Sequence, residues 1–175
     1  NVDCLSLKIE WVEMASYANR LPTCMLLGGN FTDNGEVTGW KSFESLELAE
    51  KSIFVVKQDI RLLKEYVVKY WVDHIELMLS KHVVKTSEVR YVIPHVSSMF
   101  FYYELLKELE LRNIDLGEDK WFTNLTWVGN MGSASIFVAL EELMRTKPLR
   151  KGDEILLLVP ESGRFSYGTA LLKVV

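Results

Sequence analysis

The first part of the chain alternates between apolar and polar residues. Apolar side chains at positions 5, 7, 9 and 11 are separated by Ser6, Lys8 and Glu10. This period of two is typical of a half-buried strand, so we predict a strand from Cys4 to Tyr17. A shorter apolar run at residues 24–27 leads into a polar, glycine-containing segment at 31–40, which we expect to be an exposed loop.

From Ser52 to Ser80 the spacing of apolar residues changes to three and four, which predicts a long helix with a buried stripe. Beyond it, strand-like and helix-like segments alternate. We expect strands at 88–93, 121–128 and 154–159, helices at 98–111 and 132–145, and a last strand at 165–174 that forms an antiparallel hairpin with its predecessor. This order is typical of an α/β fold in which helices cover a mixed five-stranded sheet.

Composition narrows the class of protein. The chain has 175 residues, 49% of them apolar, which is enough for the core of a folded domain. With 20 basic and 24 acidic residues it carries a net charge of −4, and no dense basic run is present, so nucleic acid is not an expected partner. The long helical segment carries charges throughout, which excludes it as a membrane span.

The cysteines and histidines are few and scattered. Two cysteines, Cys4 and Cys24, are too few to cross-link a domain of this size, so we expect a reducing, cytoplasmic location. No His and Cys residues have the spacing of metal ligands, and we expect neither a bound metal nor a cofactor.

Three loops follow predicted strands and hold candidate site residues. In open α/β sheets, ligands bind beyond the carboxyl ends of the strands, where loops and helix N-termini present free N–H groups. His95 follows the strand that Pro94 ends, Asn130 follows Gly129 before a predicted helix, and Gly163 lies in the turn of the last hairpin. Their shared placement predicts a common pocket.

Each candidate also has a purely structural interpretation. A histidine after a strand is often a satisfied structural residue, and asparagine beside glycine is a common turn former. Both alternatives stay open on the residues alone.

The motifs around these residues resemble the C-terminal half of β-ketoacyl-acyl carrier protein synthase III. They are Pro94-His95-Val96-Ser97-Ser98, Gly129-Asn130-Met131-Gly132-Ser133-Ala134-Ser135 and Gly163-Arg164-Phe165-Ser166-Tyr167-Gly168. The match covers residues 52 to 175. The resemblance therefore implies a thiolase-like fold, with 51–175 as the C-terminal domain and 1–50 as strands and a loop that complete it or link it to an N-terminal half.

The resemblance also implies roles for individual residues. His95 and Asn130 would bind the thioester carbonyl of the malonyl group, which becomes an enolate on decarboxylation, and the backbone N–H of Gly163 would stabilise the oxyanion on the acyl-cysteine. Ser98, Phe100 and Met131 would line the pantetheine tunnel. The implied substrates are acyl-CoA and malonyl thioesters, and the implied partners are acyl carrier protein, the N-terminal half and a second copy in a homodimer.

The nucleophilic cysteine of such an enzyme has no counterpart here. Neither Cys4 nor Cys24 opens a predicted helix, where the dipole would stabilise a thiolate, so we interpret both as buried thiols. The isolated chain is then expected to be inactive. Two further hypotheses stay open: a non-catalytic thiolase-like partner subunit, and a specialised branch that transfers acyl groups to oxygen. The second rests on Val96-Ser97-Ser98 replacing the family's Gln-Ala-Asn and on Phe100 replacing its Arg.

Overall fold

The computed structural model describes residues 6–175, so Cys4 lies outside the described part of the chain. These residues form two compact units. The first consists of the residues up to Ala15 with 68–160 and 167–175, and the second consists of 16–67 with 161–166.

The first unit is built on one four-stranded sheet. Its strands are β1 (Leu7–Ser16), β6 (Val89–Pro94), β7 (Glu154–Glu161) and β8 (Ser166–Val174), in the order β1-β8-β7-β6. β6 and β7 are parallel, with Val92 opposite Leu156. β8 runs antiparallel to both neighbours, since Gly152 donates to the carbonyl of Val174 at 2.8 Å and Val175 donates to that of Ser6 at 2.9 Å. The predicted mixed sheet is confirmed, with four strands instead of five.

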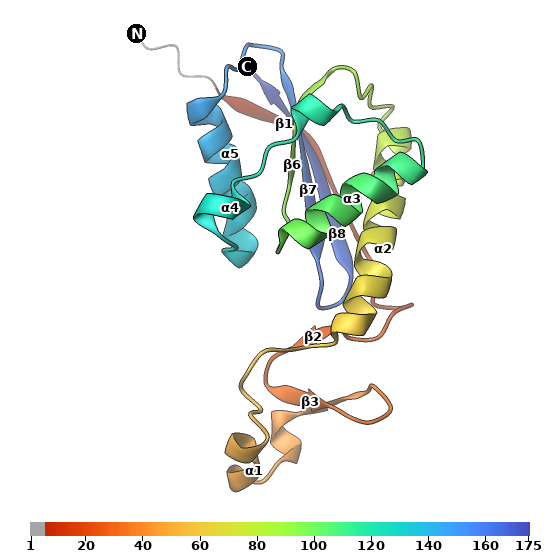
Figure 1. Cartoon of the computed structure of the whole chain (residues 1–175), viewed down its shortest axis with the longest axis vertical. Coiled ribbons are helices and arrows are strands. Elements are labelled where there is room, and N and C mark those ends of the chain that lie inside the picture. The colour runs from red at the N-terminus through yellow and green to blue at the C-terminus, as the bar shows by residue number, and fades with distance from the viewer. Residues whose placement is uncertain (1–5) are drawn as a thin grey trace. The chain divides into compact units, whose positions relative to one another are not determined.

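Helices cover both faces of this sheet (Figure 1). On one face lie α2 (Ile60–Lys81) and α3 (Met99–Leu111), and on the other lies α5 (Ser135–Thr146). The core beneath α5 is formed by its residues at helical spacing and by inward-facing residues of the strands: Ile136, Ala139, Leu143, Tyr91, Ile93, Ile155, Leu157, Leu172 and Val174. The predicted stripe on the long helix is buried from Leu63 to Met78.

The predicted strand at 121–128 is wrong. Trp121 makes a single parallel bridge with Val92, and residues Leu125–Val128 then form the short helix α4. Aromatic and β-branched residues favour a strand locally. Here the Asn124 carbonyl instead accepts the N–H groups of Trp127 and Val128, at 3.2 and 2.9 Å. Two 3-10 turns flank this region, η2 (Glu118–Lys120) and η3 (Gly132–Ala134).

The long helix also begins later than predicted, at Ile60 rather than Ser52. The carboxylate of Asp59 accepts the N–H groups of Arg61 and Leu62, both at 3.0 Å, which fixes the helix N-terminus at this point. The apolar residues 54–56 that extended the pattern are more than half exposed.

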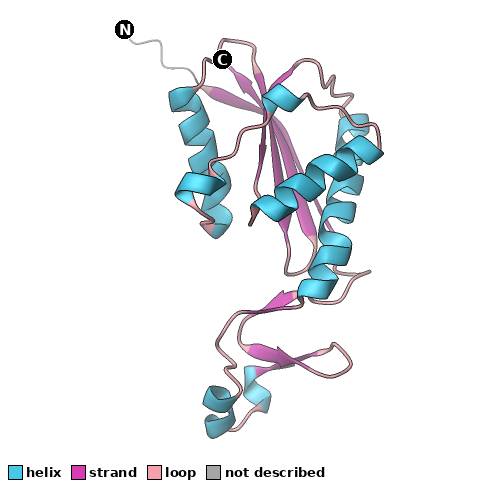
Figure 2. Ribbon diagram, in the orientation of Figure 1, coloured by secondary structure: helices cyan, strands magenta, loops and turns pink. Residues whose placement is uncertain are grey.

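The second unit consists of small elements (Figure 2). β2 (Met25–Leu26) pairs antiparallel with β5 (Lys57–Gln58), and β3 (Gly29–Phe31) pairs with β4 (Val37–Gly39). η1 (Trp40–Ser42) and α1 (Ser45–Glu50) follow β4. The segment 31–40, expected to be a loop, is therefore a hairpin with an exposed tip. Within residues 6–175, every helix is too short or too polar to cross a membrane.

Candidate active site

His95 lies immediately beyond the end of β6. Its backbone N–H donates to the carbonyl of Leu158 on β7 at 2.8 Å, which fixes the residue against the neighbouring strand. Its side chain is partly buried, and Nδ1 is buried without a hydrogen-bond partner within the described chain. Burial lowers the pKa of His95, because the charged imidazolium is poorly solvated there. The side chain is therefore neutral at pH 7.

Asn130 lies in the exposed loop between α4 and α5. Its Oδ1 accepts the backbone N–H of Gly132 at 3.0 Å and the hydroxyl of Ser135 at 3.4 Å. The Ser135 hydroxyl in turn accepts the N–H of Met131 at 2.9 Å. These bonds hold the carbonyl side of the amide against the loop. Its Nδ2 has no acceptor within residues 6–175 and remains able to donate to a ligand.

The packing of α5 on the sheet brings His95 and Asn130 to the same edge. Ile93, two residues before His95, and Ile136, near the start of α5, belong to one core cluster. The carboxyl end of β6 and the amino end of α5 lie at the same end of the sheet, with α4 alongside (Figure 1). The residues that follow β6 and those that precede α5 therefore lie at the same end of the sheet in the first unit.

The sequence did not point to the residues that support the Asn130 loop. Glu142 on α5 accepts hydrogen bonds from Asn124 Nδ2 at 2.8 Å and from Trp127 Nε1 at 3.0 Å. These two bonds lower the pKa of Glu142. Asn124 and Trp127 fell inside the wrongly predicted strand, and no local pattern connects them with an acidic residue on the next helix.

Gly163 belongs to the second unit, in the turn between β7 and β8. Its N–H donates to the carboxylate of Glu161, whose other oxygen accepts the N–H of Arg164 at 3.1 Å. Its carbonyl accepts the N–H of Cys24 at 2.9 Å. The N–H expected to stabilise an oxyanion is therefore bound to a carboxylate of the same turn.

The three predicted tunnel residues lie on the segments that follow β6 and α4. Ser98 occupies the N-cap position of α3, but its side chain makes no capping hydrogen bond. The side chain of Phe100 is 49% exposed and packs edge-to-face on Phe101, and that of Met131 is 40% exposed. All three side chains are at least partly accessible to a ligand.

Cys24 is a buried free thiol, as predicted. Burial, together with the nearby carboxylates of Asp59 and Glu161, raises its pKa to about 11. A thiol with this pKa is almost entirely protonated at pH 7 and is a weak nucleophile. Within the described residues, no three His, Cys, Asp or Glu side chains are grouped so that they could hold a metal ion.

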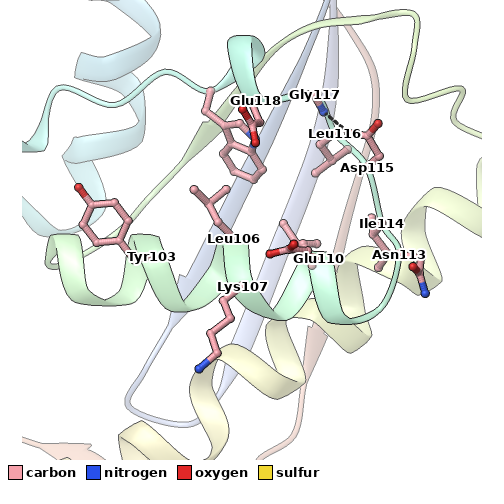
Figure 3. Close-up of a pocket in the computed structure, with 12 residues that line it drawn as sticks. Tyr103, Leu106, Lys107, Glu110, Asn113, Ile114, Asp115, Leu116, Gly117 and Glu118 are labelled. Atoms are coloured by element: carbon pink, nitrogen blue, oxygen red, sulfur yellow. Dashed lines mark hydrogen bonds between the residues drawn. The ribbon is translucent and has the colours of Figure 1, made fainter.

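A hollow of about 820 Å³ lies between α3 and the segment 113–121. Figure 3 shows Leu106 and Leu116 pointing into it, with Glu110 and Glu118 at its rim and Lys107 pointing away. None of the predicted site residues lines this hollow.

The chain matches a known family over more than half its length. The model described as 3-oxoacyl-[acyl-carrier-protein (ACP)] synthase III C terminal matches residues 79–174. The β-ketoacyl-[acyl-carrier-protein] synthase III of Clostridium kluyveri is 29% identical over 121 residues, which are 69% of this chain and 36% of that protein. The chain thus spans little more than a third of that relative.

Solved structures share the fold. The tetronic acid condensing enzyme AbyA1 superposes with a TM-score of 0.71 at 16% identity, covering 95% of this chain and 45% of that one. The 3-oxoacyl-(acyl carrier protein) synthase III of Pseudomonas aeruginosa PAO1 gives a TM-score of 0.67 at 17% identity, covering 95% and 46%. The resemblance predicted from the motifs is confirmed: the chain has a thiolase-like fold and belongs to the 3-oxoacyl-[acyl-carrier-protein] synthase III family of condensing enzymes, as its C-terminal domain.

Proposed function

We propose that this chain is the C-terminal catalytic half of a 3-oxoacyl-acyl carrier protein synthase III. The reaction is the decarboxylative Claisen condensation of an acyl thioester with malonyl-acyl carrier protein, in the biosynthesis of a fatty acid or a related ketide. The observation that supports it is that His95 follows β6 and Asn130 precedes α5, where the carboxyl end of β6 and the amino end of α5 lie at the same end of the sheet, and that the amide nitrogen of Asn130 has no acceptor within residues 6–175.

The chemistry requires donors aimed at a single oxygen. Cleavage of the bond between the malonyl carboxylate and the α-carbon releases CO₂ and leaves the electron pair as a thioester enolate. Nε2–H of His95 and Nδ2–H of Asn130 donate to the enolate oxygen and stabilise it more than the ground-state carbonyl. A neutral His95 suits this role, because the imidazole donates a hydrogen bond without taking up or losing a proton.

The second half of the reaction uses an acyl-cysteine. The enolate carbon attacks the acyl carbonyl, the resulting oxyanion collapses, and the cysteine thiolate leaves. The N–H of Gly163 stabilises this oxyanion once it is released by Glu161. Ser98, Phe100 and Met131 line the path of the pantetheine.

The nucleophile comes from the part of the relatives that this chain does not cover. An N-terminal half supplies the cysteine, 51–175 form the catalytic domain, and 1–50 complete that domain, since β1 is a strand of its sheet, or link it to the N-terminal half. The chain by itself is then inactive. The enzyme takes acyl-CoA and acyl carrier protein thioesters as substrates, needs no cofactor, and forms a homodimer when intact.

A non-catalytic partner subunit is a second candidate. The carboxylate of Glu161 on the Gly163 N–H favours it, because a negative charge at this position repels an oxyanion. A specialised branch that transfers acyl groups to oxygen would share the same donors.

The test uses this chain assembled with the N-terminal half of the Clostridium kluyveri synthase, called the assembled enzyme below. With acetyl-CoA and malonyl-acyl carrier protein, mass spectrometry follows cysteine acylation and the 3-oxoacyl product. His95→Ala should keep the acylation step and lose about 10²–10³-fold in product formation. Unchanged product formation by this variant would contradict the proposal, and an assembled wild type that acylates but never condenses would favour the silent partner.

A further inference from the structure

The carboxylate of Glu142 joins α5 to the segment that precedes Asn130. One oxygen accepts Nδ2–H of Asn124 at 2.8 Å and the other accepts Nε1–H of Trp127 at 3.0 Å. Asn124 is 5% exposed, so its amide depends on this acceptor for a hydrogen bond. Both donors lie within six residues of Asn130 in the sequence.

The segment between these donors and Asn130 has little other support. α4 is four residues long, and a helix of one turn is not stable without tertiary contacts. The side chain of Asn124, at the N-cap position, does not bond to the helix it precedes. The side chain of Trp127 is 62% exposed, so apolar burial contributes little to holding it in place.

The other side of the loop is anchored to the same helix. Ser135, at the start of α5, bonds to the backbone of Met131 and to the side chain of Asn130. Glu142 follows Ser135 after seven residues, which is close to two helical turns, so both project from the same face of α5 at a separation of about 10 Å along the axis. α5 therefore holds the loop before and after Asn130.

We infer that Glu142 is a positioning residue that fixes the loop carrying Asn130. The inference rests on the proposed function for the role of Asn130, but the hold on the loop can be tested without it. The ionised carboxylate has two equivalent acceptor oxygens and bonds both donors at once. A glutamine has one such oxygen and loses one of the two bonds.

The experiment compares three variants of this chain: Glu142→Gln, Trp127→Phe and Glu141→Gln. Glu141→Gln is the matched control, because Glu141 is the adjacent residue, carries the same charge and pairs with Arg145 in an exposed ion pair at 3.5 Å. Trp127→Phe removes one donor from an exposed side chain and leaves the core intact. Amide hydrogen exchange is followed by NMR at Val128, Gly129 and Gly132, whose N–H groups are bonded within the loop.

We expect Glu142→Gln to speed exchange at these amides by about tenfold, as for the loss of a hydrogen bond to a charged group. Trp127→Phe should give a smaller increase in the same amides, and Glu141→Gln should match the wild type. Equal exchange in Glu142→Gln and Glu141→Gln, or an increase spread evenly over the core strands, would overturn the inference.

Binding of a malonyl-pantetheine amide, in which nitrogen replaces the thioester sulfur, gives a second readout, measured on the same variants in the assembled enzyme. Weaker binding by Glu142→Gln with an unchanged unfolding midpoint supports positioning rather than general stability. If the wild type does not bind the analogue but the exchange pattern is found, the proposed function fails and the hold of Glu142 on the loop stands.

Discussion

Replacing Gly129 by alanine tests whether the backbone before Asn130 sets the direction of its amide. Gly129 has φ +85° and ψ 178°, a conformation that residues with a Cβ essentially never adopt. A Cβ at this position would meet no other atom within 4 Å, so any effect of Gly129→Ala comes from the backbone rather than from a clash. The structure separates these two causes cleanly at this residue.

The backbone of Gly129→Ala can respond to this strain in two ways, and both are measurable. If the backbone keeps its conformation, the variant loses about 1–3 kcal/mol of unfolding free energy. If it rotates, Asn130, the next residue, is displaced, and a misplacement near 1 Å can cost about 10²-fold in rate. We expect both effects in part, with condensation reduced by at least about tenfold.

Gly152→Ala is the matched control. Gly152 has φ +98°, also has no atom within 4 Å of a built Cβ, and precedes the start of β7, at the end of the parallel strands opposite to His95. Urea denaturation followed by circular dichroism should show a similar loss of stability in both variants. In the assembled enzyme, 3-oxoacyl formation should fall in Gly129→Ala and stay within about twofold of the wild type in Gly152→Ala. Equal activity of the two variants would refute the claim that the Gly129 conformation orients Asn130.

Other predictions follow from the charges and burial of single groups. Condensation should not fall as the pH drops through 6.5, the ordinary pKa of histidine, because burial lowers the pKa of His95 and keeps it neutral; a rate that halves near pH 6.5 would contradict this. Both ring nitrogens of His74 are buried without partners in the described chain, and burial lowers the pKa of this histidine in the folded state. As the pH falls below about 6.5, His74 is therefore protonated first in the unfolded state, which lowers the free energy of unfolding. Urea titrations at pH 7.5 and 5.5 should therefore show lower stability at pH 5.5, and a smaller difference in His74→Phe. Cys24→Ala should leave cysteine acylation in the assembled enzyme unchanged, as mass spectrometry of the intact chains would show, because a thiol of pKa about 11 is protonated at pH 7. Phe100→Arg should bind the acidic carrier protein several-fold more tightly than the wild type does at low salt, and this difference should shrink at high salt. Equal affinity of the variant and the wild type at both salt concentrations would place residue 100 outside the docking surface.

The sequence predicted the part of the fold that local periodicity encodes. The spacing of three and four along α2, α3 and α5 reflects burial of one face, and the structure buries that face. The alternation before Tyr17 predicted the strand β1, but no residue of β1 is fully buried, and Ile9, expected on its inner face, is 63% exposed. The placement of His95 followed from the same logic, because it comes directly after β6, which is parallel to β7. Asn130 was expected to follow a strand, but the residues before it form α4, so the reasoning from strand ends does not account for its position. The motifs then added the family, which periodicity alone does not specify.

The errors fall where a tertiary hydrogen bond outweighs a local preference. The segment 121–128 has the composition of a strand, but its polar side chains bond to Glu142, fifteen and eighteen residues further along the chain. The start of α2 was missed because apolar residues 54–56 continue the helical spacing, whereas the helix begins only after Asp59, whose carboxylate caps its N-terminus. In both places the hydrogen bonds of a single carboxylate help to determine the local backbone conformation. The pattern of apolar residues gives no indication of these bonds.

Glu161 is the third carboxylate of this kind, and it decides between the two proposed functions. It accepts the N–H of Gly163, the group that an acyl-cysteine oxyanion would need, and a fixed negative charge at that point would oppose catalysis. In a catalytic half, the Glu161 carboxylate occupies the place of the oxyanion and must be displaced by it. Glu161→Gln keeps an acceptor of the same shape but removes the negative charge that opposes the oxyanion. The variant should therefore condense faster than the wild type. In a silent partner the same substitution leaves the product undetectable. Product formation by the assembled enzyme, measured for the wild type and Glu161→Gln side by side, therefore separates the two hypotheses. If the wild type is active and Glu161→Gln forms product more slowly, the argument that the oxyanion displaces the carboxylate is contradicted.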